Sequence, residues 1–271
     1  MEFDDGAGDG ALRRRRRGGP LRLRLCYGLA EFYNCVDDLI HLPLTQQAFV
    51  HHKHEKLVKE VLDGSVKLLD VCGTARDILL MMSERVQDLR STLRRRSGRE
   101  SSMENKIDTY ICFRKKVKKD IGKCLVALKQ MANKFGSSRL LDLDQHLSVV
   151  VKVLREVSII TISIFQSLLA FISAPSKKKW SRWSLISKLV HTGSVACEGR
   201  QDNINEVESV DAALYSLHGR IRNKNSMVNM QTAQKRLETL EVSIGGFEAG
   251  LECIFRRLIQ TRVTLLNILT H

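Results

Sequence analysis

Proline is scarce in this sequence: the 271 residues include three, at Pro20, Pro43 and Pro175. A proline inside a helix removes a backbone hydrogen bond and clashes with the preceding turn, so most of the chain is free to form long helices. Because the residue before a proline avoids the helical region, each proline also predicts a boundary between elements.

The sequence also lacks a pattern of cysteines that would indicate disulfide bonds. The chain has seven cysteines, an odd number, and no two of them have C-x-x-C spacing, which argues against a complete disulfide framework. Cys72 and Cys124 fall on apolar stripes, where a reduced thiol behaves as a small hydrophobic group. No apolar core follows the arginine run near the N-terminus, so no secretory signal is predicted. We therefore expect an intracellular protein, cytoplasmic or at the membrane periphery, with the nucleus left open.

Patterns that carry catalysis are missing as well. His51, His52 and His54 form the densest histidine cluster, but no second cluster completes the three or four ligands that zinc needs. Asp37 and Asp38 are adjacent, and neighbours on a helix point about 100° apart, so they do not converge as an acid-base pair must. We expect them to cap the helix or to contact a neighbouring basic helix. The sequence thus predicts no catalytic, cofactor-binding or metal site, and hence a protein that is not an enzyme.

Three glycines, Gly245, Gly246 and Gly250, interrupt the last helical stripe. No Lys-Ser or Lys-Thr follows them and no strand precedes them, which excludes a phosphate-binding loop and a dinucleotide-binding turn. Each glycine inside a helix costs roughly 1 kcal/mol relative to alanine. Three together therefore predict a close helix crossing or a kink.

The sequence contains long stretches in which apolar residues recur at the spacing of a helix. Apolar residues recur at intervals of three and four within 68–93, 103–135, 147–171 and 230–268, and Arg114 alone is out of character in the second stripe. Such a stripe must be buried against other helices. The last stripe consists of Met230, Ala233, Leu237, Leu240, Ile244, Phe247, Leu251, Ile254, Leu258, Thr261, Leu265 and Ile268.

We predict an all-α protein: an elongated antiparallel (up-and-down) bundle of long, heptad-patterned helices joined by short loops. Residues 1–24 are expected to form a disordered Arg-rich arm, and 25–271 a single helical domain. Thr45 is the expected N-cap of the second helix, and Asp63-Gly64 the turn that ends it. The predicted helices cover 26–40, 45–62, 65–96, 101–135, 142–174, a short segment near Val190, 203–217 and the C-terminal stripe.

The charge balance is strongly basic, with a formal net charge of +14. Such a field favours nucleic acid, anionic lipid or an acidic protein as partner, without choosing among them. Arg13, Arg14, Arg15, Arg16 and Arg17 could serve as a nuclear-targeting or polyanion-binding arm, or be a charged tail with no dedicated role.

Residues 157–176 contain no charged side chain and are just long enough to span a bilayer. Seven serine, threonine and glutamine side chains lower the hydropathy of this stretch, however, and its stripe continues one that begins among polar residues at Leu147. A buried core helix is therefore favoured over a membrane-inserted one.

A basic, tryptophan-bearing segment follows that helix. Its composition suits a membrane interface or a helix-binding partner, although it could also be a linker whose indoles pack on the bundle. The candidate membrane-binding or partner-binding residues are Lys177, Lys178, Lys179, Trp180, Arg182 and Trp183.

A second basic run lies on the helix predicted at 101–135. Together with the arginine arm it makes nucleic-acid binding a third candidate, which we rank last because Phe113 is the one aromatic residue available for stacking. The run consists of Arg114, Lys115, Lys116, Lys118 and Lys119.

Several motifs resemble a plant-specific domain family of unknown function grouped with the BYPASS-like proteins. They are LAEFYNCVDD at 29–38, LPLTQQ at 42–47, LLDVCGTARD at 68–77, WSLISKL at 183–189 and LECIFRRLI at 251–259. The likeness covers about 26–271. It implies a helical plant protein associated with root and shoot development, and it implies no known activity or catalytic residue.

Taken together, these features predict a non-enzymatic helical scaffold or regulatory protein that acts through protein partners. Attachment to an anionic membrane surface by the 157–190 region is the alternative. Self-association through the heptad stripes stays open, because heptads alone do not distinguish an intramolecular bundle from an oligomer.

Overall fold

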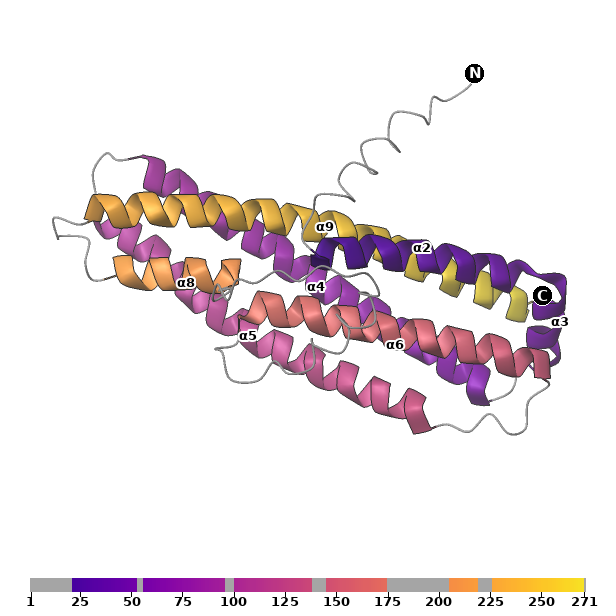
Figure 1. Cartoon of the computed structure of the whole chain (residues 1–271). Helices are drawn as coiled ribbons and strands as arrows, with labels where there is room; N and C mark the ends of the chain where they lie inside the picture. The colour runs from indigo at the N-terminus through magenta and orange to yellow at the C-terminus, as the bar shows by residue number, and fades with distance from the viewer. Residues whose placement is uncertain are drawn as a thin grey trace, which may run out of the picture.

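The computed structural model describes residues 21–52, 56–95, 100–137, 145–174, 205–218 and 226–270. These ranges are helical and contain no strand, which confirms the predicted all-α class (Figure 1). Residues 1–20 of the arm predicted at 1–24, and the short helix predicted near Val190, lie outside the described residues. The helices are α2 (Leu21–His41), α3 (Pro43–His51), α4 (Lys56–Arg94), α5 (Glu100–Ser137), α6 (Gln145–Ser173), α8 (Glu206–Leu217) and α9 (Ser226–Thr270).

The bundle is elongated because its two longest helices, α4 and α9, run antiparallel along its length (Figure 1). Arg90 of α4 pairs with Glu238 and Glu241 near the start of α9, whereas Arg262 near the end of α9 donates to Ser65 Oγ over 2.8 Å. Helix α2 lies along the second half of α9, and α8 packs against its first half. The predicted up-and-down arrangement is thus confirmed.

The predicted apolar stripes form the core. All eight stripe positions of α4, from Leu68 to Leu93, are at most 2% exposed, and the α9 stripe is buried from Ala233 to Ile268. Helix α6 is buried on a wider arc than its stripe predicts, because Ile162, Phe165 and Leu169 are also inside. This agrees with the expectation of a core helix at 157–173. In the part of the chain that the structure describes, no helix is both long and apolar enough to cross a bilayer.

Two predicted boundaries are wrong. Helix α4 runs without a break through Asp63 and Gly64, where a turn was expected. The reason is packing: a Cβ at position 64 would lie 2.6 Å from Cζ of Phe135, so this glycine admits the Phe135 ring of α5. Likewise Thr45 is not an N-cap, because α3 begins at Pro43 and the Thr45 hydroxyl instead bonds His146 Nε2 of α6 at 3.1 Å.

Helix α2 begins earlier than predicted, at Leu21 and directly after Pro20. Leucine and arginine are good helix formers, so the alternating Leu and Arg residues that were assigned to the arm extend the helix instead. The basic arm therefore ends before residue 21.

Gly250 provides the close helix crossing that the glycines of α9 predict. A Cβ at this position would lie 2.9 Å from the Cβ of Cys26 on α2, whereas a Cβ at Gly245 would have no neighbour within 4 Å. A Cβ is fixed to its backbone, so the two helices could relieve such a clash only by moving apart.

We predict that Gly250→Ala lowers the free energy of unfolding by about 1–3 kcal/mol, because it overpacks the α2–α9 contact. Gly245→Ala on the same helix is the matched control and should raise that free energy by up to about 1 kcal/mol through helix propensity. Thermal and urea unfolding of both variants measures the difference. Equal effects of the two substitutions would contradict the assigned crossing.

Buried thiols lie close to this crossing. Burial raises the pKa of Cys26 to about 12 and that of Cys72 to about 12, while Cys35 and Cys112 are exposed. Since the thiolate is the reactive form, the two buried cysteines are held in an inert state.

At mildly alkaline pH, iodoacetamide should alkylate Cys35 and Cys112 and leave Cys26 and Cys72 unmodified in the folded protein. Peptide mass spectrometry after a timed quench reads out each site. In denaturant all four should react, which controls for intrinsic reactivity. Fast labelling of Cys26 under native conditions would argue against the α2–α9 packing.

Candidate functional site: the Arg114–Asp211 cluster

Polar side chains inside the bundle join one helix to another. Tyr33 of α2 shares a 2.9 Å hydrogen bond with Thr161 of α6. Arg155 of α6 pairs with Glu60 of α4 at 3.1 Å, and both side chains are 6% exposed. Buried polar groups need such partners, since leaving one unsatisfied costs about 1–3 kcal/mol. These groups therefore hold the helices in register.

The largest of these polar clusters centres on Arg114, the basic residue in the α5 stripe. Its guanidinium, 4% exposed, faces Asp211 of α8, with Nε 3.1 Å from Oδ1 and Nη2 3.2 Å from Oδ2. Tyr110 donates to the same Oδ1 at 3.0 Å, and Lys118 Nζ lies 3.9 Å from Oδ2. Burial, followed by the Asp211 charge, raises the pKa of Tyr110 well above its ordinary value. The phenol therefore stays protonated and serves as a donor.

Arg114 also binds the C-terminal end of α6. Its Nη1 donates to the carbonyl of Ile172 at 2.8 Å, and its Nη2 reaches the carbonyl of Ser173 at 3.5 Å. The last carbonyls of a helix have no partner within the helix, and a cation there is favoured by the helix dipole. One side chain of α5 thus caps α6 while it pairs with α8.

The start of α8 is tied to the same place. The Asn205 amide donates to the carbonyl of Phe171 at 2.7 Å, and its Oδ1 accepts from the backbone N–H of Val207 at 2.9 Å, so this residue caps α8. Helix α8 therefore begins at Glu206, three positions after the predicted start at 203. Ala174, just after α6, has a left-handed φ of 43°. The chain therefore leaves α6 and enters α8 at neighbouring points.

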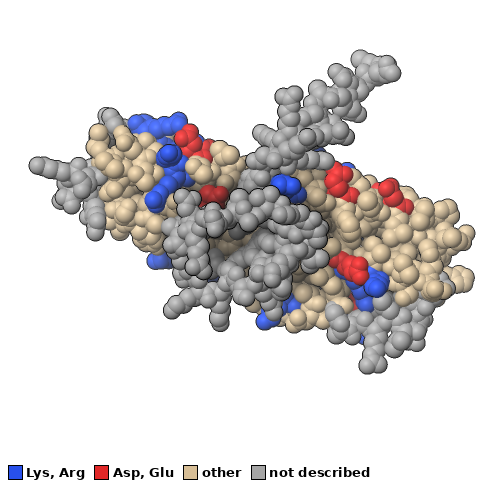
Figure 2. Space-filling view, viewed as in Figure 1, with Lys and Arg blue, Asp and Glu red and all other residues tan. Residues whose placement is uncertain are grey.

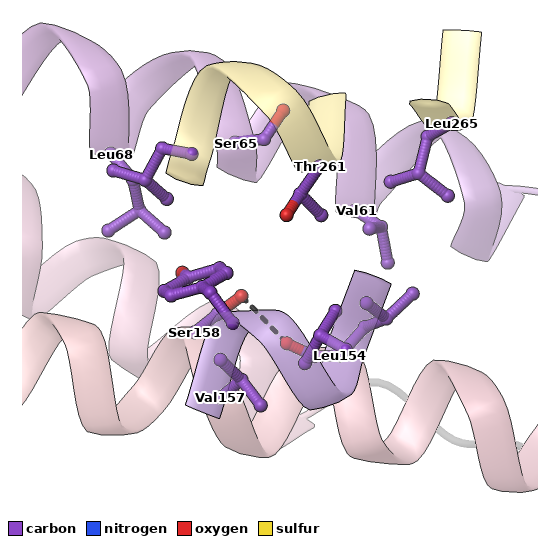
Figure 3. A pocket seen from close by; sticks show the side chains of 11 residues that line it. Val61, Ser65, Leu68, Leu154, Val157, Ser158, Thr261 and Leu265 are labelled. Carbon is purple, nitrogen blue, oxygen red and sulfur yellow. Dashed lines mark hydrogen bonds between the residues drawn. The ribbon is translucent and has the colours of Figure 1, made fainter. Parts of the chain in front are cut away.

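A cavity between α2, α4, α6 and α9 has a volume of about 30 Å³ (Figure 3). A buried water needs roughly 10–15 Å³ of such space, whereas pockets for small-molecule ligands measure roughly 300–1,000 Å³. Mostly apolar side chains line it, and the Ser158 hydroxyl is bonded to the Leu154 carbonyl at 2.8 Å. The cavity has room for a water molecule or two.

Residues 27–268 match the family model described as Protein BPS1. The chain belongs to the BPS1 family. This agrees with the resemblance to BYPASS-like proteins seen in the motifs, and membership indicates a plant developmental protein without specifying a reaction. No curated protein and no solved structure matches the chain.

The residues first suggested as binding sites fall outside the described part of this BPS1 family member. These are Arg13, Arg14, Arg15, Arg16 and Arg17, together with Lys177, Lys178, Lys179, Trp180, Arg182 and Trp183. The second group follows Ala174 in the sequence, directly after the end of α6 that Arg114 caps.

His51, His52 and Asp37 contact neighbouring side chains in the part of the chain that the structure describes. The rings of His51 and His52 are 6.1 Å apart in an edge-on contact, and His54 lies outside the described ranges. Asp37 accepts from the Gln260 amide of α9 at 2.9 Å, so it contacts a neighbouring helix through an uncharged side chain. Among the described residues, no group of three or more histidine, cysteine or acidic side chains could hold a metal ion.

One signal of the cluster is present in the sequence, namely the charge of Arg114 within an apolar stripe. The prediction that Arg114 belongs with Lys115, Lys116, Lys118 and Lys119 to a basic run for nucleic acid is wrong for Arg114, because its side chain is buried. No signal pointed to the Glu60–Arg155 pair, since neither residue lies on a predicted stripe.

Removing Arg114 should strongly destabilise the protein. Arg114→Met leaves the partly buried Asp211 without its guanidinium partner and should lower the free energy of unfolding by about 3 kcal/mol. Adding Asp211→Leu to that variant should recover a large part of the loss, because an apolar pair replaces an uncompensated charge. Denaturant unfolding of the single and double variants measures this coupling.

Lys118→Met is the matched control, since this lysine is 48% exposed and 3.9 Å from the same carboxylate. We expect a change below about 1 kcal/mol. If Arg114→Met were no more harmful than Lys118→Met, the cluster would not hold α5, α6 and α8 together.

Proposed function

We propose that this BPS1 family member is a non-enzymatic helical scaffold or regulatory protein that acts through protein partners in plant root and shoot development. The proposal rests on the way in which the buried polar groups bond one helix to another. Tyr33, Arg114 and Arg155 each bond to a neighbouring helix, and the cavity that Tyr33 lines has a volume of only about 30 Å³. Bonds between helices stabilise the shape of the bundle, and a protein of stable shape is suited to binding other proteins.

The surface also supports protein contacts. Over α2, α3 and α6, the face shown in Figure 2 carries few charged side chains. The exposed apolar residues of these helices include Phe32 at 47%, Leu44 at 68% and Ile160 at 43%. Apolar surface of this kind is typical of places where proteins associate.

We also propose that the protein binds its partners inside the cell, because its free thiols suit a reducing compartment.

The segment after α6 is a second proposed contact for partners, on the basis of its composition. Two tryptophans beside lysine and arginine provide the residue types that most often dominate protein interfaces. This segment comprises Lys177, Lys178, Lys179, Trp180, Arg182 and Trp183.

Affinity purification from plant tissue tests the proposal, using the full chain and a variant with Lys177, Lys178, Lys179, Trp180 and Trp183 changed to alanine. We expect a reproducible set of proteins that binds the wild type and is lost from the variant. The captured proteins should bind again as purified components in a complex of defined mass. The control changes Arg24, Lys59 and Lys235, on three helices of the bundle, to alanine and should keep the partners.

Two results would contradict the proposal. One is the absence of any partner that binds again in purified form. The other is reproducible turnover of a small molecule by the purified chain, at a rate that scales with protein concentration.

A further inference from the structure

Helix α5 presents a row of lysines on the side that faces away from the core. Its inward positions, from Ile107 to Phe135, are buried and fix the rotation of the helix. Lys115, Lys119 and Lys123 follow at intervals of four on the opposite side, and all three are exposed. Residues four apart on a helix share one face, so these ammonium groups form one continuous strip.

The strip is poorly neutralised. Lys123 lies 3.1 Å from Asp120, and its side chain is 69% exposed. Lys115, Lys116 and Lys119 have no ion pair with any residue that the structure describes. Like charges at this spacing repel one another along the helix. An anionic partner would remove that repulsion, which gives the strip a preference for negative charge.

Helix α5 lies at the edge of the bundle, where it packs against α4 and α6 (Figure 1). The outward row also contains a glycine between the lysines and a small or apolar residue at each end. Cys112 is exposed, Val126 is 57% exposed, and a Cβ at Gly122 would meet nothing within 4 Å. From Cys112 to Val126 the row is about 21 Å long at the helical rise per residue.

We propose that the outward face of α5, built on Lys115, Lys119 and Lys123, docks on the anionic phospholipid headgroups of a membrane surface. The convex crest of a straight helix meets a flat surface along its whole length. Lysines attract acidic headgroups, and the exposed Cys112 and Val126 at the two ends of the row suit the boundary between headgroups and acyl chains. This surface is additional to the protein contacts proposed above.

Nucleic acid fits this row less well. Phe113, the one aromatic side chain within 112–126, packs partly buried against the core, so the outward row has no aromatic side chain for stacking on bases. The row also has no exposed arginine for reading base edges. Arg114, which would have supplied a guanidinium, is buried against Asp211. The side chains of Cys112 and Val126, at either end of the row, would make no favourable contact with a phosphate backbone.

Vesicle flotation of the full chain tests this docking face. The vesicles contain phosphatidylcholine either alone or mixed with phosphatidylserine. We expect the wild type to float with the mixed vesicles and to be released by added salt. Since a lysine near an anionic surface contributes roughly fivefold in binding, the variant K115Q/K119Q/K123Q should bind on the order of a hundredfold more weakly.

Two controls separate local charge from other causes. The variant R24Q/K59Q/K235Q removes the same charge from exposed positions on α2, α4 and α9 and should keep its binding within a few-fold of the wild type. The variant K115R/K119R/K123R keeps the charge and should float as the wild type does. Circular dichroism and the thermal midpoint check that each variant is folded.

Three outcomes would overturn the proposal. The first is equal flotation of the wild type and the α5 glutamine variant. The second is equal loss in both glutamine variants, which would assign binding to overall charge. The third is a wild type that ignores vesicles but shifts duplex DNA through these lysines. None of these outcomes bears on the partner purification, because that experiment leaves the α5 lysines unchanged.

Discussion

The ion pair between Arg114 and Asp211 sets the arrangement of three helices. A guanidinium inside an apolar stripe has lost its hydration, and such a loss is tolerated only where several hydrogen bonds replace the water. Here the replacement comes from the Asp211 carboxylate of α8 and from two carbonyls at the end of α6. Helix α6 must therefore end beside α5, and α8 must begin where its carboxylate can reach the same group. Asn205 strengthens this constraint by bonding the Phe171 carbonyl.

Much of the fold could be predicted because the burial of a helix is a local, periodic signal. Every stripe position of α4 from Leu68 to Leu93 is in the core, and the α9 stripe is buried almost to its end. The cluster could not be predicted in the same way. Arg114 and Asp211 are 97 residues apart, and Glu60 and Arg155 are 95 apart, so no local pattern links the partners. A charge within an apolar stripe shows that a partner is required, but not which residue supplies it.

The wrong boundary at Gly64 has a similar cause. Locally, Asp-Gly after a helical run favours a turn, whereas in the bundle the missing side chain makes room for the Phe135 ring. Gly250 is the converse case, because the three glycines within the α9 stripe predicted a close crossing or a kink, and one of them lies against Cys26. The stripe does not tell which glycine marks the crossing, since a Cβ at Gly245 in the same stripe would meet nothing within 4 Å. Close approach depends on the neighbouring helix, which the local sequence does not specify.

The two proposed surfaces are compatible because they lie on different parts of one stiff body. Figure 1 places α2 along the upper edge of the bundle and α5 along the lower edge. Polar contacts join helices across the bundle, between Tyr33 of α2 and Thr161 of α6 and between Arg114 of α5 and Asp211 of α8. Docking of α5 on a membrane would therefore leave α2 and α3 accessible, and a protein bound there would be held at the bilayer without a conformational change. Holding proteins together at one membrane would be sufficient for a scaffold, because it raises the effective concentration of the bound proteins.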